Sequence, residues 1–73
     1  MISIKQTIYD ALVKKYEAEI LQSEATLSIY FSNPVGIGEH PQIIDEIDKL
    51  ISKLDESKGK LETITEFYSK MTT

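Results

Sequence analysis

The chain has 73 residues with 12 acidic and 8 basic side chains, a net charge of −4, no cysteine and one histidine. This composition allows one small domain and excludes disulfides, thiolate metal sites and histidine clusters, so we expect no metal and no cofactor. All basic residues are lysines interleaved with acids, so the chain lacks the basic patch and guanidinium forks of a nucleic-acid binder, and we expect no nucleic-acid partner.

The first predicted element is a helix over about residues 4–31. Ser3 is a suitable N-cap, because its hydroxyl can accept a hydrogen bond from the N–H of Gln6. Spacings of four and three residues then alternate, which is typical of a helix that packs along one seam. The seam positions are Gln6, Tyr9, Val13, Tyr16, Ile20, Ser23, Leu27 and Tyr30. The helix should end before Pro34, because a residue that precedes proline is disfavoured in the α region.

A segment rich in proline and glycine follows, and it predicts a turn over residues 32–40. Gly36 and Gly38 can adopt positive φ, which lets the chain reverse sharply. The segment is longer than a helical hairpin needs. Two interpretations stay open, a rigid corner that sets the helix spacing and a partner-recognition turn. The recognition turn would comprise Gly36, Ile37, Gly38, Glu39, His40 and Pro41.

The second predicted helix covers about residues 41–70. Pro41 suits the first helical turn, which makes His40 the expected N-cap position. Its seam positions are Ile43, Ile47, Leu50, Leu54, Ser57, Leu61, Ile64, Tyr68 and Met71. Acidic residues near its beginning and a lysine in its last turn complement the helix dipole. The pairs Asp45–Lys49, Glu56–Lys60 and Glu66–Lys70 have the i,i+4 spacing of stabilising ion pairs on exposed sides.

Together these elements predict an all-α fold, a two-helix antiparallel hairpin that forms a single domain over residues 1–73. In the expected register Ser23 faces Leu50 and Ser57 faces Tyr16, so that large and small side chains interdigitate. Tyr9 is expected near Ile64. The register should hold to about one helical turn.

Apolar residues outside the two seams make the apolar surface wider than one helix contact can cover. Ile4, Ala11, Ala18 and Ala25 form a stripe on the first helix, and Ile8, Leu12, Leu21, Ile44 and Ile51 widen the apolar surface. A stripe wider than one seam predicts further helices. The simplest source is a second copy, so we expect a homo-oligomer, first of all a dimer that forms an antiparallel four-helix bundle.

No pattern in the sequence indicates an enzyme. Gly36 and Gly38 neither follow a strand nor precede the Gly-Lys-Ser/Thr of a phosphate-binding loop. Glu39 and His40 lack the further groups that catalysis or a metal requires, so His40 is interpreted as a helix cap or a packing partner of Tyr30. Four seam tyrosines could stack on bases or a flat cofactor. They are interpreted instead as core residues whose hydroxyls reach the rim.

The same patterns predict where the protein resides. No apolar run reaches the roughly 18–20 residues of a membrane-spanning helix, so we expect no membrane partner. The amino end lacks the basic start and apolar stretch of a signal peptide. A cytoplasmic location is therefore expected.

One stretch of the chain resembles a known group of proteins. The run from Tyr30 to Pro41, with Ile43-Ile44-Asp45 after it and Tyr16-Glu17-Ala18-Glu19-Ile20 before it, is similar to small uncharacterised helical-hairpin proteins of T4-like tailed phages, including marine cyanophages. The resemblance covers about residues 9–66. It implies a phage origin, a hairpin shape and the host cytoplasm as location, and it implies no activity.

The expected function is therefore that of a small non-enzymatic protein–protein interaction protein. If the chain is a phage accessory factor, its partner would be a host or phage protein. The alternative is a structural or assembly component, such as a scaffold or a virion-associated helical protein.

Overall fold

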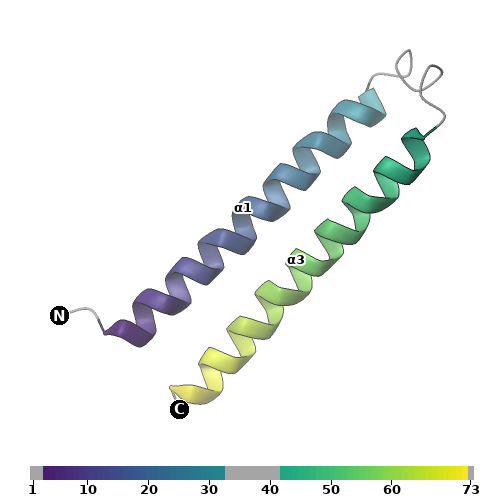
Figure 1. The fold of residues 1–73 in the computed structure, drawn as a ribbon. Coiled ribbons are helices and arrows are strands. Elements are labelled where there is room, and N and C mark those ends of the chain that lie inside the picture. Colours follow the sequence, from purple (N-terminus) through teal and green to yellow (C-terminus); the bar gives the residue numbers. More distant parts are fainter. Residues whose placement is uncertain (1–2, 33–41, 73) are drawn as a thin grey trace.

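A computed structural model describes residues 3–32 and 42–72 of the chain. These residues form two helices, α1 over Ile4–Ser32 and α3 over Ile43–Met71. The helices lie side by side and antiparallel, so that the beginning of α1 and the end of α3 lie at the same end of the hairpin (Figure 1). The predicted all-α hairpin is confirmed, and the observed helix bounds lie within two residues of the predicted ones.

The beginning of α1 is capped as the sequence predicts. The N–H of Gln6 donates a hydrogen bond to Ser3 Oγ at 3.1 Å, and the N–H of Thr7 donates to the Ser3 carbonyl, also at 3.1 Å. The serine hydroxyl thus satisfies one of the backbone donors that a helix start leaves without a partner.

The beginning of α3 differs from the prediction. Gln42, not His40, occupies the N-cap position, and its side chain makes no capping hydrogen bond. Pro41 predicted approximately where the helix begins but not which residue is its N-cap. The fixed φ and missing N–H of a proline also suit the positions just before a helix, and helix boundaries are uncertain by one or two residues. Asp45 and Glu46 in the first turn instead place negative charge near the exposed N–H groups.

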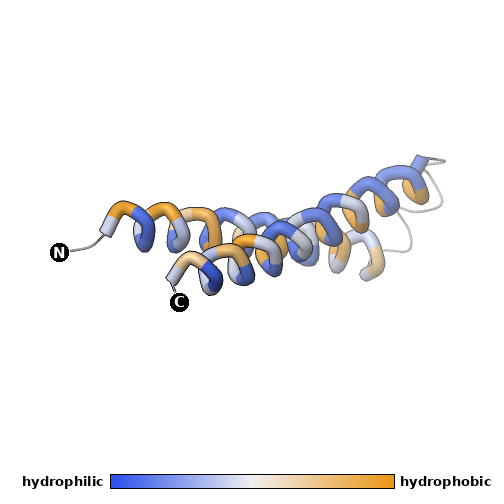
Figure 2. The backbone as a smooth tube through the Cα atoms, turned by 90° about the horizontal axis from the view of Figure 1, so that it is seen from below, coloured by the Kyte–Doolittle hydropathy of each residue, from blue (hydrophilic) through white to orange (hydrophobic). Residues whose placement is uncertain are grey.

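The contact between the helices follows the predicted seams. Every predicted seam residue is buried or half-buried except Met71, which is 44 % exposed. Met71 follows Tyr68 by one turn, and the Tyr68 hydroxyl donates to Gln6 near the beginning of α1. Little of α1 extends past this level to cover Met71. Figure 2 shows that hydrophobic and hydrophilic residues alternate along both helices, as expected of helices that pack along one side.

Small polar residues are the most deeply buried part of the seam. Ser57 is 1 % exposed and Ser23 is 3 % exposed, whereas Leu27 and Ile43 are the only buried hydrophobic residues among those the structure describes. A buried serine occupies little volume, so it leaves space for larger side chains of the opposite helix. The seam is therefore one layer of side chains deep.

The helix register agrees with the prediction to within one turn. The Tyr68 hydroxyl donates to Gln6 Oε1 at 2.8 Å, and the Tyr30 hydroxyl donates to Glu46 Oε2 at 3.0 Å. The Tyr9 ring, however, stacks on Tyr68 with centroids 4.2 Å apart and planes at 13°. Tyr68 lies one turn beyond Ile64, the expected neighbour of Tyr9, and the stacked rings gain an aromatic contact there.

Replacing the most buried serine with a large residue should destabilise the hairpin. We expect Ser57→Leu to lower the free energy of unfolding by about 1–3 kcal/mol, because the added methyl groups have no space in the seam. Urea denaturation followed by circular dichroism measures the change. Ser52→Leu is the matched control, since Ser52 is exposed on the same helix. Equal stability of the two variants would contradict the steric role of Ser57.

Candidate functional site

The predicted recognition turn lies outside the described residues. Gly36, Ile37, Gly38, Glu39, His40 and Pro41 all belong to the segment between α1 and α3. Their proposed role in partner recognition therefore stays a prediction. The described residues instead contain a second candidate surface, which lies on one flank of the seam.

This surface consists of residues that recur every seven positions beside the seam. On α1 they are Lys5, Leu12 and Glu19, and on α3 they are Lys53, Lys60 and Phe67. Contacts across the hairpin place them on one side, because Lys53 pairs with Glu19 and the Lys60 ammonium lies 5.9 Å from the centre of the Tyr16 ring. We call these six residues the lysine–glutamate face.

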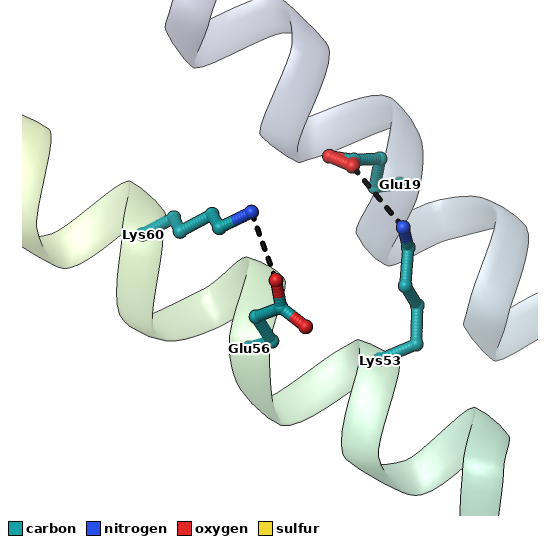
Figure 3. A network of polar contacts seen from close by, with 4 residues as sticks. All are labelled: Glu19, Lys53, Glu56 and Lys60. Atoms are coloured by element: carbon teal, nitrogen blue, oxygen red, sulfur yellow. Dashed lines mark ion pairs between the residues drawn. The ribbon is translucent and has the colours of Figure 1, made fainter.

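At the middle of this face Glu19, Lys53 and Lys60 lie close together, with Glu56 of α3 beside them (Figure 3). Lys53 Nζ is 3.6 Å from Glu19 Oε2 across the seam, and Lys60 Nζ is 2.9 Å from Glu56 Oε1 along α3. The second pair confirms the predicted Glu56–Lys60 interaction. The predicted Asp45–Lys49 ion pair is wrong: both residues are described, and no such pair forms, because two exposed chains gain little by holding one geometry.

The contact between Glu56 and Lys60 alters the proton affinity of both groups. The hydrogen bond and charge of Lys60 lower the pKa of Glu56, and Lys53 adds to this effect. The same hydrogen bond and the Glu56 charge raise the pKa of Lys60, with a smaller contribution from Glu19. Glu56 and Lys60 therefore keep their charges over a wider pH range than either group would alone.

Glu19 is the least satisfied polar group of this face. Its side chain is only 17 % exposed, and Oε1 is buried without a hydrogen-bond partner among the described residues. The Lys53 contact to Oε2, at 3.6 Å, is longer than the roughly 2.7–2.9 Å of a charge-assisted hydrogen bond. A buried carboxylate oxygen without a donor costs the isolated hairpin free energy.

Toward the open end of the hairpin the same side becomes apolar. A hollow of about 180 Å³ is lined by Lys5, Ile8, Tyr9, Ile64, Phe67, Tyr68 and Met71. A shallower depression of about 560 Å³ adjoins it, since Ile64 and Phe67 line both. Ile8 and Phe67 are 54 % and 58 % exposed, so large apolar surfaces meet solvent there. Such a surface is suited to contact with apolar groups of another molecule.

The opposite flank of the hairpin also exposes apolar residues, but at the other end. Phe31 and Ile44 are both 69 % exposed where the helices approach the turn, and Ile51 is 47 % exposed. Leu21 lines a depression with Ile20 and Leu61 near the middle of the chain. The two flanks therefore differ in where their apolar surface lies along the hairpin.

The tyrosines occupy the positions expected of core residues. All four are half-buried, and two of them, Tyr30 and Tyr68, use their hydroxyls in hydrogen bonds across the seam. The Tyr30 bond to Glu46 raises the Tyr30 pKa, mainly through the hydrogen bond and then through the carboxylate charge. These contacts hold the ends of the two helices in register.

Within residues 3–32 and 42–72, no group of three or more histidine, cysteine, aspartate or glutamate side chains could hold a metal. The same residues contain no helix with the length and apolar character needed to cross a membrane. What the lysine–glutamate face offers is apolar contact area beside fixed, alternating charges.

Replacing Glu46 with glutamine should lower the Tyr30 pKa toward its ordinary value, because the charged acceptor that retains the phenol proton is lost. An NMR pH titration of the Tyr30 ring carbons measures the change, with Glu66→Gln as the control. Since folding raises this pKa, the contact stabilises the hairpin fully below the unfolded pKa of tyrosine. The contribution disappears as the pH rises through the folded pKa. An unchanged Tyr30 pKa in Glu46→Gln would contradict the assignment.

Sequence reasoning missed the half-buried carboxylate of Glu19 and the exposed ring of Phe67. Phe67 could have been found, because it is a large apolar residue that falls outside the four-three spacing of the seam. Comparison of the chain with protein-family models, with curated proteins and with solved structures finds no match. The resemblance to phage hairpin proteins therefore stays a prediction.

Proposed function

We propose that this chain is a small non-enzymatic interaction protein that associates with a second copy of itself. The observation that carries the proposal is the large apolar surface that one hairpin leaves exposed. The exposed large apolar residues are Ile4, Ile8, Leu21, Ile29, Phe31, Ile44, Ile51, Phe67 and Met71. Of the off-seam residues singled out by the sequence, only Leu12 and the alanines are absent from this group.

The total surface supports the same proposal. The chain exposes 5741 Å², whereas a folded monomer of 8.3 kDa exposes about 4,600 Å², an excess of about 1,100 Å². A standard interface buries about 800 Å² of each partner. The excess is therefore large enough to supply one interface.

The shape explains why the excess arises. The hairpin measures 54 × 20 × 14 Å, and its radius of gyration is 16.7 Å compared with about 11 Å for an average domain of this length. Two parallel rods bury only the strip between them. A second hairpin laid on one flank would turn the single layer of side chains, over the length that it covers, into the core of a four-helix bundle.

A second part of this proposal is a phage accessory role, in which the partner is a host or phage protein. The elongated shape also suits the alternative, an assembly component that lies along a larger structure. An accessory factor should copurify with one protein partner, whereas an assembly component should sediment with particles.

Sedimentation equilibrium tests the self-association directly. We expect a reversible monomer–dimer equilibrium at micromolar concentration, because burial of the exposed apolar side chains offsets the entropy of association. Thermal unfolding should shift to higher temperature as the protein concentration rises. A monodisperse monomer at several hundred micromolar would contradict the proposal.

The turn can be tested separately by the double substitution Glu39→Ala with His40→Ala. Neither residue belongs to the seam, so we expect the helix content and the self-association to be retained. Circular dichroism and sedimentation measure these two properties, and a pull-down from host lysate measures partner capture. Lost capture with intact folding would favour the recognition turn, whereas retained capture with intact folding would favour the rigid corner.

A further inference from the structure

We propose that the lysine–glutamate face is the surface that meets the second copy, with the two hairpins antiparallel and a two-fold axis beside Leu12. In this arrangement Lys5 of each copy lies against Glu19 of the other. The inference rests on the proposed self-association and specifies its face, direction and register. It follows from one unsatisfied carboxylate, from the spacing of charges on α1 and from the apolar surface beside them.

The Glu19 carboxylate is held only loosely by its own hairpin. Oε1 has no hydrogen-bond partner among the described residues, and Lys53 reaches only the other oxygen, at 3.6 Å. Lys5 lies on the same face and lines the apolar hollow. Among residues 3–32 and 42–72, no carboxylate forms an ion pair with Lys5. On this face Lys5 thus has no ion-pair partner among the described residues, and Glu19 has one, at 3.6 Å.

Lys5 and Glu19 lie at positions that a two-fold axis can bring together between two copies. Lys5 and Glu19 lie one heptad before and one heptad after Leu12, on the same side of α1. They are about 21 Å apart along the helix, so they cannot meet within one chain. A two-fold axis through the level of Leu12 reverses α1 and lays it on a second α1. Both Lys5–Glu19 contacts then form together, and the half-buried Leu12 side chains meet between them.

The same axis brings matching groups together on α3. Tyr9 stacks on Tyr68, and Tyr16 lies beneath Lys60, so Leu12 lies level with the residues near Ile64. Rotation about this axis places Lys60 of one copy at about the height of Phe67 of the other. The ammonium of one copy then lies near the exposed ring of the other. On α1 it also sets Ile8, 54 % exposed, opposite Tyr16 of the second copy.

The opposite flank of α1 is not complementary to itself. Asp10, Glu17 and Glu24 recur there at seven-residue spacing, and all three are exposed. An antiparallel copy of α1 laid on that flank would bring acidic side chains together, which is unfavourable. The lysine–glutamate face, in contrast, carries both signs in an order that a two-fold axis matches.

Charge reversal tests the register. Lys5→Glu places two acids against each other in the dimer, and Glu19→Lys places two lysines against each other, so we expect each variant alone to dimerise at least about tenfold more weakly. Mixing the two variants brings opposite charges together at both contacts. Sedimentation and native mass spectrometry should then show a heterodimer close to wild-type affinity, and the doubly substituted chain should again form a homodimer.

Lys58→Glu is the matched control, because Lys58 is exposed seven residues after Ile51 on the opposite flank, so the same charge reversal there should leave dimerisation unchanged. Circular dichroism establishes that each variant keeps its helices, and the mixing experiment remains decisive if Glu19→Lys lowers hairpin stability. A dimeric wild type whose variants show no preference for the heterodimer would overturn this register and leave self-association intact. A monomeric wild type would overturn the proposed function together with this inference.

Discussion

The single seam between α1 and α3 is the contact on which the rest of the structure depends. Two helices meet along one strip, and within the described residues that strip buries only Leu27 and Ile43 among its hydrophobic side chains, with Ser23 and Ser57 at its closest points. Because small scaffolds gain little net stability from so thin a core, the hairpin depends on every additional contact that it can make. The tyrosine hydrogen bonds at its two ends and the ring stack of Tyr9 on Tyr68 are such contacts. They explain why polar and aromatic groups, rather than a large apolar core, hold the helices in register.

A thin seam also decides where function can lie. Side chains beside the seam are neither fully buried nor fully solvated, so charges there can be held by the opposite helix while remaining accessible to another molecule. Glu19 shows this balance, because α3 covers most of its side chain yet supplies only one distant ammonium. The apolar hollow near Phe67 shows the same incompleteness in apolar form. Both features lie on one face, and a second hairpin would complete both, which is why the proposed association and its register arise from the same residues.

Much of this architecture could be predicted from periodicity. Alternating spacings of four and three residues selected the buried positions of both helices, since only side chains on that strip can reach the opposite helix. Ser3 could be recognised as a cap because its hydroxyl accepts a hydrogen bond from the N–H of Gln6, three residues later in the chain. Local signals failed where several backbone positions satisfy them equally, and Pro41 consequently suggested a cap at His40, two residues before the observed cap at Gln42. Tyr9 lines one hollow together with Ile64, as expected, but its stacking on Tyr68 was inaccessible from the sequence, because only the packed geometry decides which ring it meets.

The sequence by itself determined the two helices, the seam that joins them and the excess of apolar residues over what one seam can cover. These properties depend on composition and on the 3.6-residue period of the helix, both of which are local. Only the tertiary structure decided which charges meet across the hairpin, because the relative offset of two helices depends on how all seam side chains pack at once. That offset brought Lys53 and Lys60 to the side of Glu19 and Tyr16, left one carboxylate oxygen without a donor, and opened the hollow beside Phe67. The packing of the two helices therefore determines the candidate surface, whereas the spacing of the apolar residues determines the hairpin that carries it.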